Sequence, residues 1–264
     1  MSIKFTERIT SRKNPAVIEA AKLSDRKYRE ASGSFAFEGI KLFEEAINAG
    51  ADIKSVFVTD AAAEKYAYVI ERSGAERILS VTDEVLSKLT SENAPQGIFA
   101  VAGYFAAPKK RAGDSCFAVV LDGVADTGNL GTVIRTADAF GAAGVYIGND
   151  GADIYNPKTV RSAMGSIFRV PAERCDAKKA VEKLKADGYK VYASMLSDGA
   201  KDVRDTDMSG KIAFVVGNEG HGVSPRVAAA CDGAVIIPMS GGAQSLNAAV
   251  AAAVLMWEVS RKNV

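Results

Sequence analysis

The sequence predicts an α/β protein in which a smaller α/β domain precedes a larger domain built on a parallel sheet. The strongest indication lies in the second half, where short β-branched runs alternate with helical segments. These runs are apolar almost throughout, as expected of parallel strands that helices cover on both faces. The composition, 48% hydrophobic and 25% charged over 264 residues, excludes disordered and low-complexity classes.

The first half reads as short helices alternating with short strands, which predicts a small α/β domain over residues 1–105. The expected strands lie at residues 55–58, 77–81 and 97–105, and the expected helices at residues 43–47, 64–71 and 83–89. Residues 106–114, AAPKKRAGD, are polar, basic and punctuated by Pro and Gly, so they are predicted to be a domain linker.

The second predicted domain, residues 115–264, alternates strands and helices regularly. Its strands are expected at residues 117–121, 144–147, 189–194, 212–216 and 234–237, and its helices at residues 130–140, 178–186, 225–230 and 246–261. Within the last helix, residues 248–257 are apolar on every side, so we expect burial all round. The sheet would cover one face, and either the same chain or a second copy would cover the rest.

The charge is balanced overall but not locally. With 33 Lys and Arg against 32 Asp and Glu, the net charge of +1 gives no general attraction for nucleic acid. Residues 1–29, however, hold eight basic and three acidic side chains, 8 − 3 = +5. On charge alone this excess is typical of a solvated amphipathic helix, and a basic N-terminal arm that contacts phosphates is the alternative. The candidate contacts are Arg8, Arg12, Lys13, Arg26, Lys27 and Arg29.

Cysteine and histidine usage argues against a metal site. The three cysteines are widely separated, no Cys-x-x-Cys pair occurs, and His221 is the only histidine. The first ten residues lack the apolar run of a signal peptide, and the longest apolar run is about half of the ~20 residues that a membrane span needs. We therefore expect a cytoplasmic protein without metal or membrane contact.

Three strand-to-helix turns carry unusual residues, and ligands on parallel sheets bind at such turns. The first is residues 126–141, DTGNLGTVIRTADAFG, where two glycines flank Asn129 at a helix start and Arg135 follows on that helix. Alternatively, Asn129 only caps the helix and Arg135 pairs with Asp138.

The second turn is residues 217–222, GNEGHG, which holds Glu219 among three glycines. Its spacing differs from the dinucleotide fingerprint and it lacks the Walker lysine, which weakens nicotinamide and nucleotide-hydrolysis interpretations. A merely flexible loop is the alternative. The third turn is residues 237–247, IPMSGGAQSLN, where capping the next helix would explain either Ser245 or Asn247, but hardly both.

Together the three turns resemble the SpoU (TrmH-like) branch of the SPOUT RNA methyltransferases over about residues 115–260. The matching motifs, in order, are N-x-G-x-x-x-R from Asn129 to Arg135, G-x-E-x-x-G from Gly217 to Gly222, and I-P-M-x-G…S-L-N from Ile237 to Asn247. Residues 1–105 are similar, more loosely, to the substrate-binding domain that precedes this domain in many members. Thr127 stands where many members have proline.

The resemblance implies a C-terminal domain with a deep trefoil knot, an exception to the rule against knots. It further implies methyl transfer from S-adenosylmethionine to a ribose 2′-hydroxyl of RNA, and a homodimer formed near the knot. The cofactor-binding positions would be Ser194, Met195, Leu196, Gly217, Asn218, Gly222, Ile237, Pro238, Met239, Ser245 and Leu246. The catalytic positions would be Asn129, Arg135, Glu219, Ser245 and Asn247.

Two roles remain open for Arg135. The resemblance implies that this arginine is the catalytic base, yet an arginine side chain keeps its proton at neutral pH. The role that needs no proton loss is to bind a phosphate and to stabilise the developing alkoxide. His221 is a rival base by residue type alone.

The expected substrate is large-subunit ribosomal RNA, for housekeeping modification or antibiotic resistance. The alternatives are transfer RNA as the target and a non-catalytic RNA-binding protein of the same fold. A nicotinamide-dependent dehydrogenase is disfavoured, because the sequence lacks the glycine spacing that such enzymes require.

Overall fold

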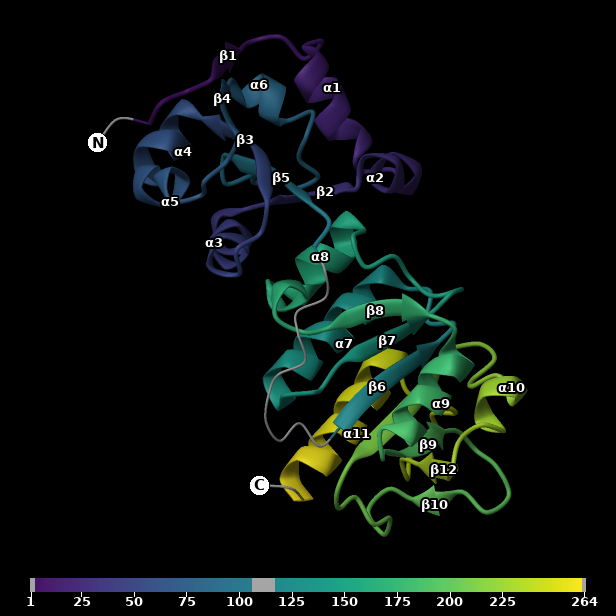
Figure 1. The fold of residues 1–264 in the computed structure, drawn as a ribbon. Coiled ribbons are helices and arrows are strands. Elements are labelled where there is room, and N and C mark those ends of the chain that lie inside the picture. The colour runs from purple at the N-terminus through teal and green to yellow at the C-terminus, as the bar shows by residue number, and fades with distance from the viewer. Residues whose placement is uncertain (1–2, 106–116, 263–264) are drawn as a thin grey trace. The chain divides into compact units, whose positions relative to one another are not determined.

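The structure, a computed structural model, describes residues 3–105 and 117–262. The chain divides into two compact units (Figure 1). The first contains Met1–Ala106 together with Tyr155–Phe168, and the second contains Ala107–Ile154 and Arg169–Val264. The predicted linker, residues 106–114, lies outside the described residues.

A mixed five-stranded sheet forms the centre of the first unit, which confirms the small α/β domain. Its order is β1-β4-β3-β5-β2, with β1, β4 and β3 parallel and β5 antiparallel to both of its neighbours. The strands are β1 (Glu7–Ile9), β2 (Ser34–Glu38), β3 (Ile53–Thr59), β4 (Arg77–Val81) and β5 (Ile98–Gly103). The helices are α1 (Pro15–Lys22), α2 (Arg26–Ser32), α3 (Ile40–Asn48), α4 (Asp60–Lys65), α5 (Ala67–Glu71) and α6 (Asp83–Leu86).

The N-terminal segment is an integral part of this unit. β1 pairs with β4 as an edge strand, and α1 begins at Asn14, whose side chain accepts a hydrogen bond from the Ala16 amide. Val17 and Leu23 are buried in the same apolar cluster as Phe57 and Leu79 of the sheet. Deleting residues 1–29 would therefore remove part of the core and not just a charged arm.

A segment distant in sequence, residues 155–168, completes the first unit. It contains α8 (Pro157–Ala163), which ends at Met164 in the left-handed conformation with φ of 50°. Tyr155 stacks on Tyr104 with 4.1 Å between ring centroids and lies 4.8 Å from the ring of Phe35. The sequence does not predict this helix, because a short helix with few apolar residues lacks a strong hydrophobic period.

The second unit is built on a seven-stranded sheet that is parallel throughout, as predicted. Its order is β10-β12-β9-β11-β6-β7-β8. The strands are β6 (Phe117–Asp122), β7 (Val145–Gly148), β8 (Ala172–Cys175), β9 (Lys190–Ser194), β10 (Lys201–Asp202), β11 (Ile212–Gly217) and β12 (Gly233–Ile236). The two strands of this sheet that were not predicted, β8 and β10, are its edge strands, and both lack the long apolar run of a central strand; the edge strands of the first unit's sheet, β1 and β2, were not predicted either.

Helices cover both faces of this sheet (Figure 1). The helices are α7 (Thr127–Phe140), α9 (Ala177–Ala186), α10 (Pro225–Ala228) and α11 (Ala248–Lys262). On one face, α9 packs against β6, β7 and β9 through a cluster that includes Val181, Leu184, Val120 and Val215. On the other face, α11 packs against α7, β11 and β6.

The last helix is not buried on every side within one chain. Leu255, Met256 and Val259 are buried, whereas Val250 is 48% and Trp257 55% exposed. Of the two alternatives for this helix, burial entirely within one chain is therefore wrong, and an apolar strip of α11 faces outward. No helix in residues 3–105 or 117–262 is long and apolar enough to cross a membrane.

Candidate active site at three strand ends

Three neighbouring parallel strands of the second unit end at one edge of the sheet. Ser194 of β9 is in register with Val216 of β11 on one side and with Val235 of β12 on the other. Because the strands run in the same direction, the segments that follow them come together at this edge. Two of these segments, residues 217–222 and 237–247, are turns with unusual residues in the sequence, and the third begins with Ser194, Met195 and Leu196, which the family resemblance assigned to the cofactor.

A pocket of about 340 Å³ opens at this edge, a size suited to a small-molecule ligand. Every predicted cofactor position except Pro238 lines it. Much of its wall is apolar, from side chains such as Ile237, Met239 and Leu246, and Leu196 is 77% exposed beside it. The lining residues that the sequence analysis did not assign to the cofactor are Val216, Glu219, His221, Val223, Val235, Ile236, Gln244, Ala248 and Ala251.

The glycine-rich loop after β11 folds back on itself. A Cβ atom on Gly217 would lie 2.0 Å from the carbonyl carbon of Gly222, so only glycine fits this position. The backbones of Asn218 and Gly222 exchange hydrogen bonds of 3.1 and 2.8 Å, and Gly222 has φ of +67°. The loop is therefore a closed, hydrogen-bonded turn and not merely a flexible segment.

Asn218 anchors this loop with its side chain. Its Nδ2 donates to the Gly123 carbonyl at 2.9 Å, just after β6. Its Oδ1 accepts from the amides of Gly220 at 2.8 Å and His221 at 3.3 Å. The loop that lines the pocket is thus tied to the turn that precedes α7.

Three of the predicted catalytic side chains form one hydrogen-bonded chain. Asn247 Oδ1 accepts from the backbone amides of Ala249 at 2.9 Å and Val250 at 3.3 Å, at the start of α11. Its Nδ2 therefore points away and donates to Asn129 Oδ1 at 3.0 Å. Asn129 Nδ2 in turn donates to Glu219 Oε1 at 2.6 Å. The backbone N–H groups of Ala249 and Val250 fix which atom of Asn247 is the oxygen, and this in turn fixes the orientation of the Asn129 side-chain amide.

The structure places the other two catalytic candidates differently. Ser245 lines the pocket. Arg135 is exposed on α7, and no hydrogen bond or ion pair within the described residues joins it to the Asn129 network.

The two alternatives for this helix, that Asn129 only caps it and that Arg135 pairs with Asp138, are wrong. Asp126, and not Asn129, caps α7: its side chain accepts from the Asn129 amide at 2.8 Å. Asp138 is paired with Arg169, with 2.8 Å between Oδ2 and NH2, and not with Arg135. Neither role therefore accounts for the side chain of Asn129, which hydrogen-bonds to Glu219 and Asn247, or for the exposed side chain of Arg135.

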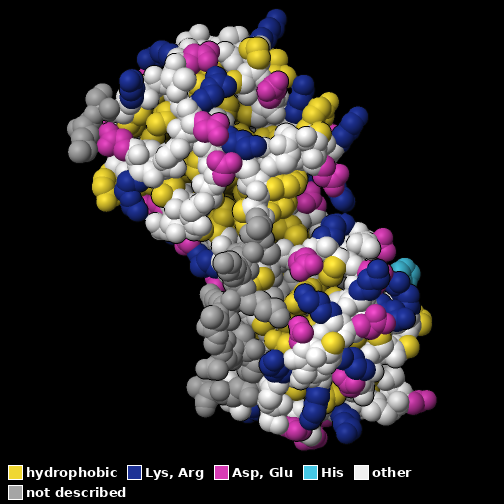
Figure 2. Space-filling view, in the orientation of Figure 1, with side chains coloured by type: hydrophobic (Ala, Val, Ile, Leu, Met, Phe, Trp, Pro, Cys, Tyr) yellow, Lys and Arg dark blue, Asp and Glu magenta, His cyan; other side chains and the backbone are white. Residues whose placement is uncertain are grey.

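The predicted RNA contacts all lie in the first unit, where basic and acidic side chains are interspersed on the visible surface (Figure 2). Lys13, Lys27 and Arg12 are exposed. Arg8 is also exposed but pairs with Asp60 at 2.8 Å, and Arg26 pairs with Glu30 at 2.6 Å. The exposure of these five side chains is compatible with the predicted RNA contacts.

Arg29 requires a correction. Its side chain is 1% exposed, and it donates to the carbonyls of Leu23 at 2.7 Å and Ser24 at 2.8 Å. These bonds tie α2 to the end of α1. A side chain so enclosed cannot contact RNA. A count of charged residues did not reveal the burial of Arg29, because a buried arginine counts the same as an exposed one.

Metal chemistry finds no support in the described residues: no group of three or more His, Cys, Asp or Glu there could hold an ion. An apolar pocket across the ends of parallel strands, with amides and a carboxylate beside it, instead defines an α/β enzyme that binds an organic cofactor.

Comparisons with known proteins extend this assignment. Residues 116–257 match the SpoU rRNA Methylase family, and residues 14–100 match the MRM3-like substrate binding domain. The chain is 36% identical to the 23S rRNA (guanosine(2553)-2′-O)-methyltransferase RlmP of Bacillus subtilis, over 96% of this chain and 99% of the relative. It is 32% identical to the 23S rRNA (uridine(2479)-2′-O)-methyltransferase of Streptomyces viridochromogenes, over 97% and 93%. An AdoMet-bound rRNA methyltransferase from Sinorhizobium meliloti superposes with a TM-score of 0.87 at 32% identity, over 97% and 98%.

The chain belongs to the SpoU rRNA methylase family. It is an RNA methyltransferase, and its cofactor is S-adenosylmethionine.

Proposed function

We propose that this enzyme methylates a ribose 2′-hydroxyl in 23S ribosomal RNA. The observation that carries the proposal is the hydrogen-bond network from Asn247 through Asn129 to Glu219, which lies beside the strand-end pocket. This network fixes two side-chain amides and a carboxylate, groups that can orient a ribose by hydrogen bonds. The two 23S rRNA methyltransferases to which the chain is similar support this choice of substrate.

The residues present fit the cofactor. The pocket combines apolar walls, from Leu196, Ile237 and Leu246, with the backbone of the closed Gly217–Gly222 turn. Apolar side chains suit the adenine ring, and backbone N–H and C=O groups suit its polar edge and the ribose. S-adenosylmethionine supplies an electrophilic methyl group. The predicted cofactor positions that line the pocket would hold it there.

Polar side chains of the protein would position the ribose 2′-hydroxyl that accepts the methyl group. Glu219 and Ser245 both line the pocket, which supports a role for them where cofactor and ribose would meet. Asn129 holds one carboxylate oxygen of Glu219, which restrains that side chain before the RNA arrives. Preorganisation of this kind lowers the entropic cost of aligning the 2′-hydroxyl.

Arg135 would anchor the RNA backbone. Its side chain is exposed and extends from the helix that carries Asn129. A guanidinium can grip a phosphate with two hydrogen bonds and stabilise negative charge that develops on the attacking oxygen. This role needs no loss of the arginine proton, whereas base catalysis would.

The target base does not follow from the site. Of the two relatives, one is named for a guanosine and the other for a uridine. A site built around ribose and cofactor accommodates either. Base selection is therefore expected from the first unit, which contains the residues that match the substrate binding domain.

An in vitro assay tests the proposal. The purified protein is incubated with radiolabelled S-adenosylmethionine and separate transcripts of 23S rRNA, 16S rRNA and transfer RNA, and the products are digested to nucleosides. A labelled 2′-O-methylnucleoside from 23S rRNA is expected. Label found only in transfer RNA would show that transfer RNA, and not 23S rRNA, is the substrate. Cofactor binding without methyl transfer to any RNA would indicate a non-catalytic RNA-binding protein.

We further propose a homodimer that buries the outward strip of α11. Val250 and Trp257 are exposed, and Val254 lies between them at helical spacing. Trp257 contacts Phe140 of α7 with 5.8 Å between ring centroids, so the apolar surface extends across two helices. Apolar patches of this kind mark association surfaces. Sedimentation equilibrium at micromolar concentration should give twice the mass of one chain; the mass of a single chain would refute the dimer.

Two further properties accompany this proposal. The deep trefoil knot is proposed for the second unit, where α11 packs against both α7 and β11. A cytoplasmic location is proposed because ribosomal RNA is the substrate.

A further inference from the structure

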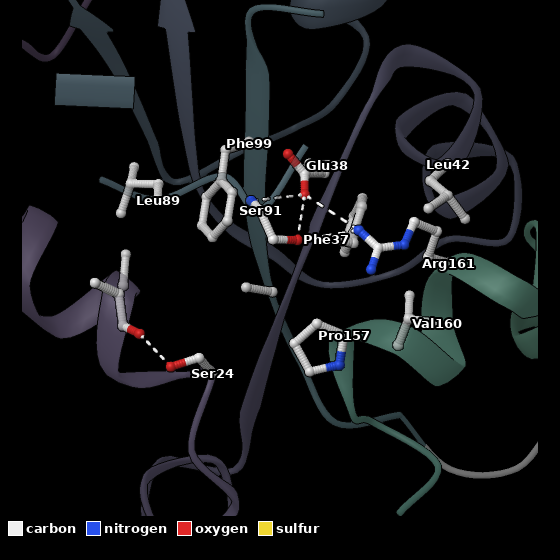
Figure 3. A pocket seen from close by; sticks show the side chains of 13 residues that line it. Ser24, Phe37, Glu38, Leu42, Leu89, Ser91, Phe99, Pro157, Val160 and Arg161 are labelled. Carbon is white, nitrogen blue, oxygen red and sulfur yellow. Dashed lines mark hydrogen bonds and ion pairs between the residues drawn. The ribbon is translucent and has the colours of Figure 1, made fainter. Parts of the chain in front are cut away.

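The first unit holds a cavity of about 130 Å³ that the proposed chemistry does not use (Figure 3). It is formed by α1, β2, α3, β5 and α8 together with the segment that follows α6. Its lining residues are Ala20, Ala21, Ser24, Ala36, Phe37, Glu38, Leu42, Leu89, Ser91, Phe99, Pro157, Val160 and Arg161.

The walls are apolar and include two aromatic rings. Phe37 and Phe99 are 4% and 6% exposed, and Leu42 and Val160 are buried beside them. The volume is well below the about 340 Å³ of the cofactor pocket, and it suits one flat heterocycle and not a whole nucleotide. Aromatic and aliphatic side chains are the usual partners of an unstacked RNA base.

A carboxylate and a guanidinium stand together at the cavity. Glu38, with a side chain 17% exposed, accepts hydrogen bonds from the Thr90 hydroxyl and, at 3.3 Å, from the Ser91 amide. Arg161 NH1 lies 3.9 Å from Glu38 Oε1 and donates to Ser91 Oγ at 3.0 Å (Figure 3). An acceptor and a donor are therefore fixed side by side.

Such a pair complements the edge of a nucleobase. Each base presents hydrogen-bond donors beside acceptors, and carboxylates and arginines read those edges in nucleic-acid complexes. The ion pair of Arg161 with Glu92 also keeps the guanidinium in place on α8. Both charged groups are thus oriented before any ligand binds.

The rest of the unit indicates which ligand fits. Residues 14–100, which match the MRM3-like substrate binding domain, contain all lining residues except the three on α8. We propose that this cavity receives one unpaired base of the RNA substrate, which Phe37 and Phe99 contact and Glu38 and Arg161 read at its edge. This assignment rests on the proposed function insofar as the substrate is RNA.

Filling the cavity tests the assignment without removing a charge. Ala21 is half-buried on α1 and lines the cavity, so Ala21→Leu places a larger side chain in it while preserving helix propensity. Ala61→Leu, at an exposed position of α4, is the matched control. Loss of one base contact should weaken binding of the full-length protein to a fluorescent 23S rRNA fragment about tenfold. Equal affinities for the two variants would overturn the proposal.

Thermal unfolding checks that Ala21→Leu folds, and Ser24→Leu, at an exposed position of the same cavity, replaces it if it does not. The wild-type protein is also crosslinked to 23S rRNA transcripts that contain 6-thioguanosine or 4-thiouridine. Crosslinks in peptides around Phe37 or Phe99 are expected, and crosslinks confined to other parts of the first unit would contradict the proposal.

The same samples separate the two hypotheses. If wild-type protein transfers no methyl group to any RNA, the proposed function fails. If it methylates 23S rRNA and the Ala21→Leu variant binds and methylates as the Ala61→Leu control does, only the base cavity fails.

Discussion

Asn129 donates a hydrogen bond of 2.6 Å to Glu219, 90 positions later in the chain, and accepts one of 3.0 Å from Asn247, 118 positions later. The three residues come from the start of α7, the loop after β11 and the start of α11. One amide therefore joins all three sequence motifs. Its two hydrogen bonds set the orientation of a carboxylate that lines the cofactor pocket.

The Asn247→Asp variant separates helix capping from this network. An aspartate still accepts from the Ala249 and Val250 amides, but it cannot donate to Asn129. We expect kcat/KM for methyl transfer to fall by about 100-fold, while the free energy of unfolding changes by less than about 0.5 kcal/mol. Urea titration and the labelled-methyl assay measure the two quantities. Full activity in a stable variant would contradict the positioning role.

Replacing Arg135 by alanine should abolish methyl transfer without destabilising the protein. The side chain is exposed and has no ion pair within the described part of the chain, so its removal costs folding little. Cofactor binding, measured by calorimetry, should not change. Weaker RNA binding would favour the phosphate anchor, and unchanged RNA binding would favour the base.

The control for that variant is Arg169→Ala. This arginine pairs with Asp138, whose side chain is 12% exposed, so its loss should destabilise the second unit by about 1–2 kcal/mol. Once folded, the variant should retain methyl transfer. Activity of Arg135→Ala within a few-fold of wild type would show that the site assignment is wrong.

Two glycines in one loop should respond differently to substitution by alanine. At Gly217 a Cβ atom would lie 2.0 Å from the Gly222 carbonyl carbon, so the closed turn must open and cofactor affinity should fall by more than about tenfold. At Gly220 the nearest atom would be 3.4 Å away, and affinity should change little. Calorimetric titration with S-adenosylmethionine compares them. Equal affinities would mean that the turn does not shape the pocket.

Lys27 and Arg29 stand two positions apart on α2 and have opposite expected roles. Arg29→Ala removes two buried hydrogen bonds to carbonyls and should lower the free energy of unfolding by about 2–4 kcal/mol. Lys27→Ala, at an exposed position, should leave stability unchanged and reduce the salt dependence of RNA binding by about one phosphate contact. An unaltered salt dependence would remove Lys27 from the RNA-binding surface.

The terminal helix provides a pH-dependent test. Hydrogen bonds from Arg261, at 2.6 and 2.7 Å, lower the pKa of Glu258 below its usual range, and those from Lys262 add to the effect although partial burial opposes it. A lowered folded-state pKa means that the stabilisation is present above the unfolded pKa of about 4.3 and is lost as the pH falls through the folded-state value.

The Glu258→Gln variant should therefore be less stable than wild type by about 1 kcal/mol at pH 7, and the difference should shrink below about pH 4. Glu182→Gln is the control, since Glu182 forms only an exposed pair with Lys178 at 3.5 Å and should show no difference at either pH. Urea titrations at several pH values measure these differences. A difference for Glu258→Gln that does not depend on pH would exclude the ionic contribution.

The sequence predicted the central strands of both sheets because their residues are apolar and β-branched, and β4 matches its expected range of residues 77–81. It did not predict the helix α8 or the edge strands β1, β2, β8 and β10, where tertiary contacts and not periodicity decide the structure. Arg29 shows the same limit, since its charge is visible in sequence but its burial between α1 and α2 is not.

The strand-end residues of the candidate site could be found from sequence because glycines and polar groups stand where strands end. Their hydrogen-bond partners could not, since Asn129, Glu219 and Asn247 meet only after the parallel sheet forms. The first-unit cavity left no motif at all, because α8 completes it from a distant part of the chain.

The central claim is that this enzyme methylates a ribose in 23S rRNA through Arg135 and the Asn129 network. The most direct test maps 2′-O-methyl groups in 23S rRNA from cells that lack the gene, complemented with wild type or with Arg135→Ala. We expect one 23S position whose methylation disappears on deletion, returns with wild type and stays absent with the variant. Unchanged 23S methylation in the deletion strain, or its full restoration by Arg135→Ala, would show that this enzyme does not act on 23S rRNA through Arg135.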